Sequence, residues 1–131
     1  MSVNKFAFVA LCISIFAFVG CGGGEMVLNY NNSPIVAKSG KKNMESIRRA
    51  ILLAGARIGW QMKEKGNGQV TATKFSRGFM AQVNITYTTE SYAITYKDSS
   101  NLKYNGQTIH PTYNKWVADL NSAIRTNLSH M

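Results

Sequence analysis

The sequence predicts a small α+β domain: an antiparallel meander of three to four strands, with an N-terminal and a C-terminal helix packed on one face. Two observations predict this class. Apolar residues recur at helical spacing over residues 44–54 and 113–128. Between these segments, apolar and polar residues alternate in consecutive runs that are separated by short turns. Such a sheet is expected to bury one face under both helices and to keep its other face wet.

The first helix is expected to begin after residue 43. Asn43 is a suitable N-cap, and Glu45 in the first turn interacts favourably with the helix dipole. Gly55 is expected to end this helix. One apolar stripe is formed by Met44, Ile47, Ile51 and Ala54.

The strands are expected where the period changes to two, over residues 58–62, 70–73, 79–87 and 92–97. Their connections are predicted at Gly66-Asn67-Gly68, Ser76-Arg77-Gly78 and Thr88-Thr89-Glu90. Asn105-Gly106 predicts another small hairpin, between residues 102–104 and 107–109. Pro111 suits the first turn of the final helix. The apolar stripe of that helix consists of Tyr113, Trp116, Val117, Leu120, Ile124 and Leu128.

The N-terminus has the layout of a secretory signal. Lys5 precedes a run over residues 6–19 without a charged residue, and small residues follow. This run is shorter than the roughly 20 residues that a membrane-spanning helix needs.

Phe18-Val19-Gly20-Cys21 resembles the lipobox of bacterial lipoproteins, with Phe18 where an aliphatic residue is usual. The resemblance implies a signal peptide over residues 1–20, cleavage between Gly20 and Cys21, and diacylglycerol on the Cys21 thiol. It also implies acylation of the new amino terminus. Several acyl chains would make Cys21 a stable membrane anchor.

Removing residues 1–20 leaves 111 residues, which is enough for one domain. Cys12 would leave with the signal and Cys21 would carry lipid, so no disulfide is expected. Residues 21–42 are interpreted as a lipidated flexible tether, because glycine and turn-forming residues are frequent there. Residues 43–131 form the single expected domain. The alternative for residues 26–28 and 35–36 is a short edge strand packed on that domain.

The chain contains 15 Lys and Arg against six Asp and Glu, and loss of Lys5 leaves a net charge of +8. Export argues against nucleic acid and favours anionic lipid, lipopolysaccharide, cell-wall polymer or another envelope protein as partner. A basic cluster close in sequence to the lipid predicts electrostatic docking on the membrane, the alternative being an ordinary solvated surface. The cluster consists of Lys38, Lys41, Lys42, Arg48, Arg49 and Arg57.

A second resemblance covers residues 43–128. The matching segments are Gly59-Trp60, residues 92–99 with Asn101-Leu102, Ile109-His110-Pro111 and Tyr113-Asn114-Lys115-Trp116-Val117. They are similar to a group of small uncharacterised bacterial lipoproteins. That group implies a fold and a location but no activity.

Polar residues near the end of the last strand could carry chemistry, and His110 with Asp98 or Ser99 is the set to consider. They are Tyr96, Lys97, Asp98, Ser99, Asn101 and His110. The sequence has no nucleophile elbow, no metal-spaced histidines and no paired carboxylates. We therefore expect turn hydrogen bonds and helix capping, with neither enzyme activity, metal nor cofactor. Trp60 and Trp116 could stack on sugars, but their periodic placement favours the core.

These observations predict a lipid-anchored cell-envelope lipoprotein with a non-enzymatic binding or structural role in the periplasm. Gly22 after Cys21, by resemblance to sorted lipoproteins, favours the outer membrane. The alternatives are a direct binder of anionic envelope ligands and a small hydrolase-like enzyme that uses His110 and Asp98.

Overall fold

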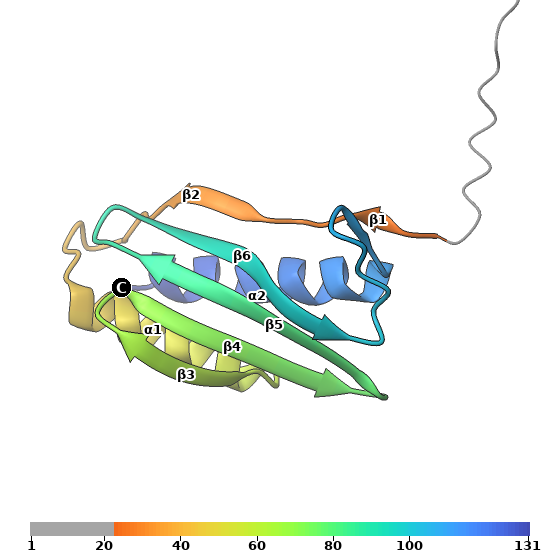
Figure 1. Cartoon of the computed structure of the whole chain (residues 1–131). Helices are drawn as coiled ribbons and strands as arrows, with labels where there is room; N and C mark the ends of the chain where they lie inside the picture. The colour runs from red at the N-terminus through yellow and green to blue at the C-terminus, as the bar shows by residue number, and fades with distance from the viewer. Residues whose placement is uncertain (1–22) are drawn as a thin grey trace, which may run out of the picture.

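The computed structural model describes residues 23–131, so the expected signal peptide, Gly20 and Cys21 lie outside the described residues (Figure 1). Two helices and a five-stranded antiparallel sheet form an α+β domain, with a separate two-stranded sheet at one end. The elements are β1 (Glu25–Met26), β2 (Tyr30–Pro34), α1 (Met44–Arg57), β3 (Gln61–Gly66), β4 (Gln69–Ser76), β5 (Phe79–Tyr87), β6 (Ser91–Ser100), β7 (Thr108–Ile109) and α2 (Pro111–Ser129).

The main sheet has the strand order β2-β6-β5-β4-β3. The four strands β3 to β6 form the expected meander, in which each strand pairs with the next along the chain. The fifth strand, β2, pairs with the free edge of β6 and was not in the expected count of three to four. The fold class is therefore confirmed, and the sheet has one strand more than expected.

The centre of the sheet shows why one face is buried. On β5, Ala81, Val83 and Ile85 are fully buried, while the alternating residues Gln82, Asn84 and Thr86 are more accessible. Both helices lie on the same side of the sheet in Figure 1. The period-two pattern thus separates a face packed on α1 and α2 from an open, polar face.

The start of α1 follows the sequence expectation. The Ser46 backbone N–H donates to Asn43 Oδ1 at 2.8 Å, which satisfies one of the free amides of the first turn. Ile47 and Ile51 are fully buried, whereas Met44 at the helix start is 38% exposed. The apolar stripe therefore faces the core from its second turn onward.

The end of α1 corrects the expectation for Gly55. The helix continues through Gly55 to Arg57, and a side chain at position 55 would collide with Met62 of β3. Gly59, whose φ of +92° suits glycine, lies directly after the C-cap Ile58. Consequently β3 begins at Gln61 rather than Ile58.

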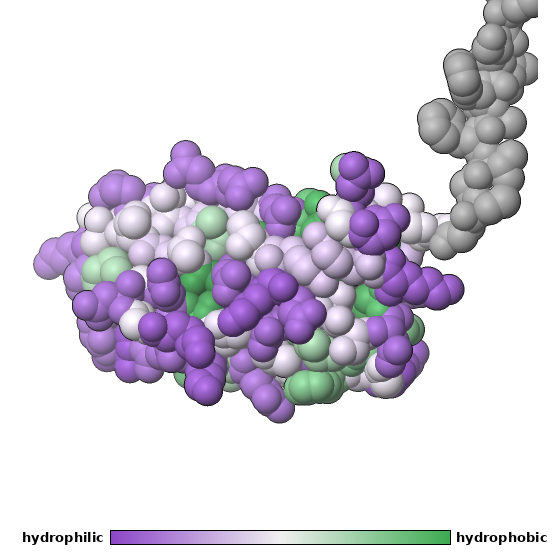
Figure 2. All heavy atoms as spheres, viewed as in Figure 1, coloured by the Kyte–Doolittle hydropathy of each residue, from purple (hydrophilic) through white to green (hydrophobic). Residues whose placement is uncertain are grey.

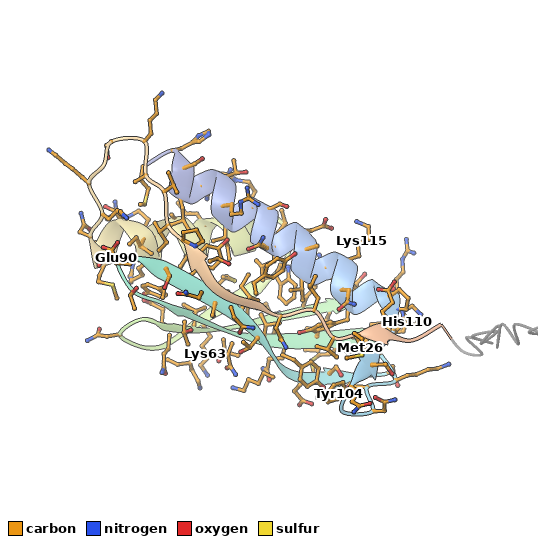
Figure 3. The ribbon with its side chains drawn as sticks, turned by 90° about the horizontal axis from the view of Figure 1, so that it is seen from above. Met26, Lys63, Glu90, Tyr104, His110 and Lys115 are labelled. Carbon is orange, nitrogen blue, oxygen red and sulfur yellow. The ribbon has the colours of Figure 1, made fainter. Side chains whose placement is uncertain are left out.

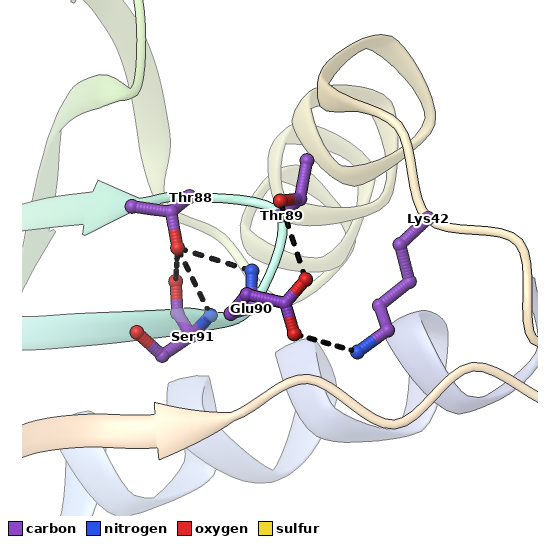
Figure 4. Close-up of polar contacts among 5 residues, drawn as sticks. All are labelled: Lys42, Thr88, Thr89, Glu90 and Ser91. Carbon is purple, nitrogen blue, oxygen red and sulfur yellow. Dashed lines mark hydrogen bonds and ion pairs between the residues drawn. The ribbon is translucent and has the colours of Figure 1, made fainter.

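The connections between β4, β5 and β6 are tight turns, as expected. Arg77 and Gly78 both have positive φ, at +53° and +82°, and join β4 to β5 in a two-residue hairpin loop. At the β5–β6 turn, Thr88 Oγ1 accepts from the backbone N–H groups of Glu90 and Ser91 (Figure 4). These turns fix the register of the meander.

The segment expected as a tether contributes two strands, which corrects that interpretation for residues 25–34. Edge strands form as in the alternative, but over residues 25–26 and 30–34 rather than 26–28 and 35–36. Tyr30 pairs with Ile94 of β6, and Ile35 is only 2% exposed. Asn114 of α2 holds the segment further: its Oδ1 accepts from the Leu28 backbone N–H at 2.9 Å, and its Nδ2 donates to the Met26 carbonyl at 2.8 Å. Backbone groups that were expected to be solvated are thus paired with the domain.

The small hairpin expected over residues 102–109 is also corrected. Thr108 and Ile109 pair with Met26 and Glu25, so β7 takes β1 as its partner. Asn105 still forms a turn, because its Oδ1 accepts from the backbone N–H groups of Gln107 and Thr108. Residues 108–109 thus pair with β1 from the N-terminal segment and not with residues 102–104.

The final helix begins as expected, with Pro111 in its first turn and His110 as its N-cap. His110 Nδ1 accepts from the Thr112 backbone N–H at 3.1 Å. Val117, Leu120 and Ile124 are fully buried against α1 and the sheet, and Trp116 is half-buried. Within residues 23–131, neither helix is both long and apolar enough to cross a membrane.

Tyr113 provides a test of this core. Its side chain is fully buried, and within the described residues its hydroxyl has no hydrogen-bond partner. Because an unpaired buried hydroxyl costs about 1–3 kcal/mol, Tyr113→Phe is expected to raise the free energy of unfolding by about 1 kcal/mol in urea denaturation. Tyr104→Phe, at a side chain that is 40% exposed, is the matched control and should change little.

The same tyrosine predicts a pH dependence. Burial raises the pKa of Tyr113, and its neighbours Tyr96 and Tyr104 raise it further. As the pH rises, the unfolded chain therefore loses this proton before the folded protein does. The contribution of Tyr113 to the free energy of unfolding is constant below the ordinary tyrosine pKa of about 10 and falls above it. The alkaline fall should be smaller in Tyr113→Phe. An equal fall, or a destabilised variant at neutral pH, would contradict the assignment.

Candidate functional site

The basic cluster expected to face the membrane is partly neutralised by carboxylates. Arg48 Nε lies 2.5 Å from Glu64 of β3, and Glu45 contacts both Arg48 and Arg49 at 3.3–3.4 Å. Lys42 pairs with Glu90 at 3.3 Å (Figure 4). Three of the six side chains thus have ion-pair partners, which weakens the cluster as an anionic-surface contact.

Most of the cluster lies at the end of the domain opposite β1. The loop that carries Lys38 is held at the C-terminal end of α2, where the Lys38 and Ser39 backbone N–H groups donate to Ser129 and Met131 carbonyls. Figure 1 places this loop and the start of α1 at one end of the domain and β1 at the other. Arg57, at the end of α1, lies apart from the rest. The part of the cluster near Lys38 is therefore close to β1 in sequence but not in the fold.

The polar residues considered for catalysis have structural partners. Tyr96 and Ser99 hydroxyls lie 2.8 Å apart, and Asp98 Oδ1 accepts from the Ser99 backbone N–H. Asn101 Nδ2 donates to the Gly78 carbonyl at 2.7 Å, and His110 caps α2. Within residues 23–131, no hydrogen bond joins His110 to Asp98 or Ser99. The geometry matches the expected turn and capping roles.

Two further side chains were considered as sugar-stacking residues. Trp60 is 3% exposed and belongs to the core. Trp116 packs against Phe79 with ring centroids 6.4 Å apart, and Lys74 Nζ lies 5.5 Å from the Trp116 ring centre. In the described part of the chain, no group of three or more His, Cys, Asp or Glu is placed to hold a metal ion.

A groove of about 700 Å³ lies between β2 and α2, which run side by side in Figure 3. It is lined by Tyr30, Ser33, Pro34, Val36, Tyr92, Asn121, Ser122, Arg125, Thr126, Leu128 and Ser129. Hydroxyl groups from both walls, an amide and one guanidinium supply its polar groups. The groove has the size of a small-molecule site.

The floor of the groove is an ordered polar pair. The Tyr92 hydroxyl donates to Asn121 Oδ1 at 2.6 Å, and the two side chains are 1% and 6% exposed. Because this bond occupies Oδ1, the amide presents its Nδ2 donor as the free group. Burial raises the pKa of Tyr92, while the neighbouring Ser33 hydroxyl and Arg125 charge act in the opposite direction. The floor is thus fixed in orientation before any ligand binds.

Arg125 supplies the charge of the groove. Its side chain is exposed on α2, and no carboxylate of the described residues lies within ion-pair distance of it. It differs in this respect from Arg48 and Arg49. A guanidinium with unused donors next to an amide N–H and hydroxyls can bind a carboxylate or phosphate group.

Sequence reasoning missed the groove because its walls come from distant segments. Tyr30 and Ser33 lay in the expected tether, and Arg125 lay off the apolar stripe of the last helix. The available signal was Asn121, a polar residue next to Leu120 and Ile124 on the buried side of α2. A buried amide requires a partner, and here the partner is Tyr92.

Comparisons with protein-family models, curated proteins and solved structures found no match for this chain.

Proposed function

We propose that this protein is a lipid-anchored lipoprotein of the bacterial cell envelope whose domain binds a ligand and does not catalyse a reaction. The groove between β2 and α2 is the observation that supports the binding role best. It combines an accessible volume, an ordered polar floor and an arginine that has no ion-pair partner among residues 23–131. Asp98, Asn101 and His110, which lie outside the groove, hydrogen-bond in turns and at a helix cap.

The anchor rests on the sequence of the first 21 residues. Phe18-Val19-Gly20-Cys21 follows an uncharged run, and the resemblance to a lipobox supports lipid on Cys21. Only residues 22–24 separate Cys21 from β1. We place the protein at the outer membrane, facing the periplasm, because Gly22 follows Cys21.

A specific observation favours an anionic envelope ligand over a neutral one. The donors that line the groove are the Arg125 guanidinium, the Asn121 amide and several hydroxyls, and none of the described acidic residues lines it. Phosphate groups of lipopolysaccharide or of cell-wall polymers match these donors. In this proposal Arg125 binds the anionic ligand, rather than Arg48 and Arg49, which already have carboxylate partners.

Binding of purified lipopolysaccharide to the wild-type protein and to Arg125→Gln tests this assignment. A charge-assisted hydrogen bond contributes about 1.5–3 kcal/mol, so the variant is expected to bind about tenfold or more weakly. Binding should also weaken with added salt. Titration calorimetry at two salt concentrations measures both effects.

Arg49→Gln is the matched control, because Arg49 is exposed, pairs with Glu45 and does not line the groove. It should retain wild-type affinity. Equal losses in the two arginine variants would show that binding depends on net charge alone. Affinity that does not change in Arg125→Gln would remove the groove from the proposal.

A further inference from the structure

Three large apolar side chains are exposed at the end of the domain that carries β1. Met26 is 69% exposed, Phe75 is 63% exposed and Tyr104 is 40% exposed. Met26, Tyr104 and the N-cap His110 lie at this end in Figure 3. Hydrophobic surface also gathers where β4 runs into β5 at the same end in Figure 2. Exposed apolar groups of this size mark an interaction surface when they gather on one end of a molecule.

A chain of contacts joins these positions into one end face. β1 pairs with β7, and the His110 backbone N–H that follows β7 donates to the Leu102 carbonyl. Asn101 Nδ2 donates to the Gly78 carbonyl in the β4–β5 turn. Figure 1 accordingly shows β1, β7, the start of α2 and the β4–β5 turn together at one end. We call this surface the anchor end.

Basic side chains accompany the apolar ones at the anchor end. Arg77 at the tip of the β4–β5 turn and Lys103 beside Tyr104 are both exposed. Within the described residues neither has an ion-pair partner. Two carboxylates lie near this end: Glu25, which accepts from Asn114 Nδ2, and Asp98, which accepts from the Ser99 backbone N–H.

The chain that precedes β1 determines what can reach this end. Cys21 lies four residues before Glu25, and an extended chain spans at most about 3.3–3.6 Å per residue. A lipid on Cys21 would therefore hold Glu25 within about 14 Å of its attachment point. The anchor end would therefore lie close to the bilayer surface. A flexible 20-residue tether would instead allow a separation of about 25 Å between the domain and the bilayer.

We propose that the anchor end docks into the headgroup layer of an anionic bilayer, with Met26, Phe75 and Tyr104 entering the interface and Arg77 and Lys103 contacting lipid phosphates. Aromatic side chains favour the membrane interface, and basic ones are attracted to anionic lipid. This inference rests on the proposed lipid anchor. It fixes the orientation of the domain and turns the basic cluster near Lys38 away from the membrane.

Two variants of the full chain that each add one cysteine test the orientation. The added thiol is labelled with a fluorophore after processing in cells, and the protein is reconstituted into phosphatidylethanolamine and phosphatidylglycerol vesicles. Ser100→Cys places the label beside Met80, which pairs with Phe75 at the anchor end. Ser39→Cys places it in the loop at the opposite end. The label at position 100 should be quenched by lipid-borne nitroxide, and the label at position 39 should be quenched by aqueous iodide.

Adding Phe75→Ser to the Ser100→Cys protein should shift its quenching from lipid nitroxide toward iodide while the protein still floats with vesicles. Leu53→Ser is the matched control, because Leu53 is 53% exposed but lies on α1. A protein that floats with vesicles but has equally water-accessible labels at both positions would overturn docking and leave the anchor intact. A processed protein that does not float with vesicles would overturn both proposals.

Discussion

Cys21→Ser is expected to abolish membrane attachment of the protein in cells. The serine hydroxyl does not replace the thiol to which the lipobox resemblance assigns diacylglycerol, so the chain would lack acyl groups. Several acyl chains give stable anchoring, whereas the domain alone would dock only weakly and reversibly. Fractionation of cells should move the protein from the membrane pellet to the soluble fraction, and labelled palmitate should no longer enter it.

Cys12→Ser is the control, because Cys12 lies within the expected signal peptide and should be removed before the mature protein forms. It should retain both membrane attachment and palmitate label. If Cys21→Ser sediments with membranes and keeps its label, the lipid anchor is wrong. The proposed orientation of the domain would then lose its basis as well.

Ile85→Ala is expected to have the largest effect on stability among the variants considered. Ile85 is fully buried at the centre of the sheet, between Val70 of β4 and Ile94 of β6. Truncating a buried isoleucine to alanine costs about 2–5 kcal/mol, which is a large part of the 5–15 kcal/mol that stabilises a typical domain. Urea denaturation followed by circular dichroism measures the loss.

Thr86→Ala is the matched control, because Thr86 is the next residue of β5 and lies on the open face. Its effect should stay within about 1 kcal/mol, the range of strand propensity. Similar losses at positions 85 and 86 would mean that the helices do not cover only one face of the sheet.

Alternation of apolar and polar residues predicted the meander because each strand from β3 to β6 pairs with its sequence neighbour. Local turn chemistry, such as Arg77-Gly78, then fixed the connections. The first cap and the last helix were also predictable from Asn43 and Pro111, since caps depend on residues close in sequence.

Pairings between distant segments were not predictable in the same way. β1 and β2 are short, and β2 contains two asparagines. They become strands because β7 and the edge of β6 present unpaired backbone groups. Gly55 resembled a helix stop, but close packing against Met62 accounts for it. In both cases the local signal was overridden by a contact with a remote part of the chain.

The candidate site was hidden for the same reason. The groove joins Ser33 of β2 to Arg125 of α2, which are 92 positions apart in the sequence. Basic residues near Cys21 were visible in the sequence, but their ion pairs with Glu45, Glu64 and Glu90 were not. Basic residues that are close in sequence form a positively charged surface only where carboxylates from other segments do not pair with them.

Intact-mass measurement of the protein extracted from membranes tests the lipid anchor most directly. We expect a chain that begins at Cys21 and carries the mass of diacylglycerol on this residue, with one more acyl group on its amino terminus. Fragmentation should place all of the added mass on Cys21. A chain that begins at another residue, or an unmodified Cys21, would contradict the lipid anchor and the orientation built on it.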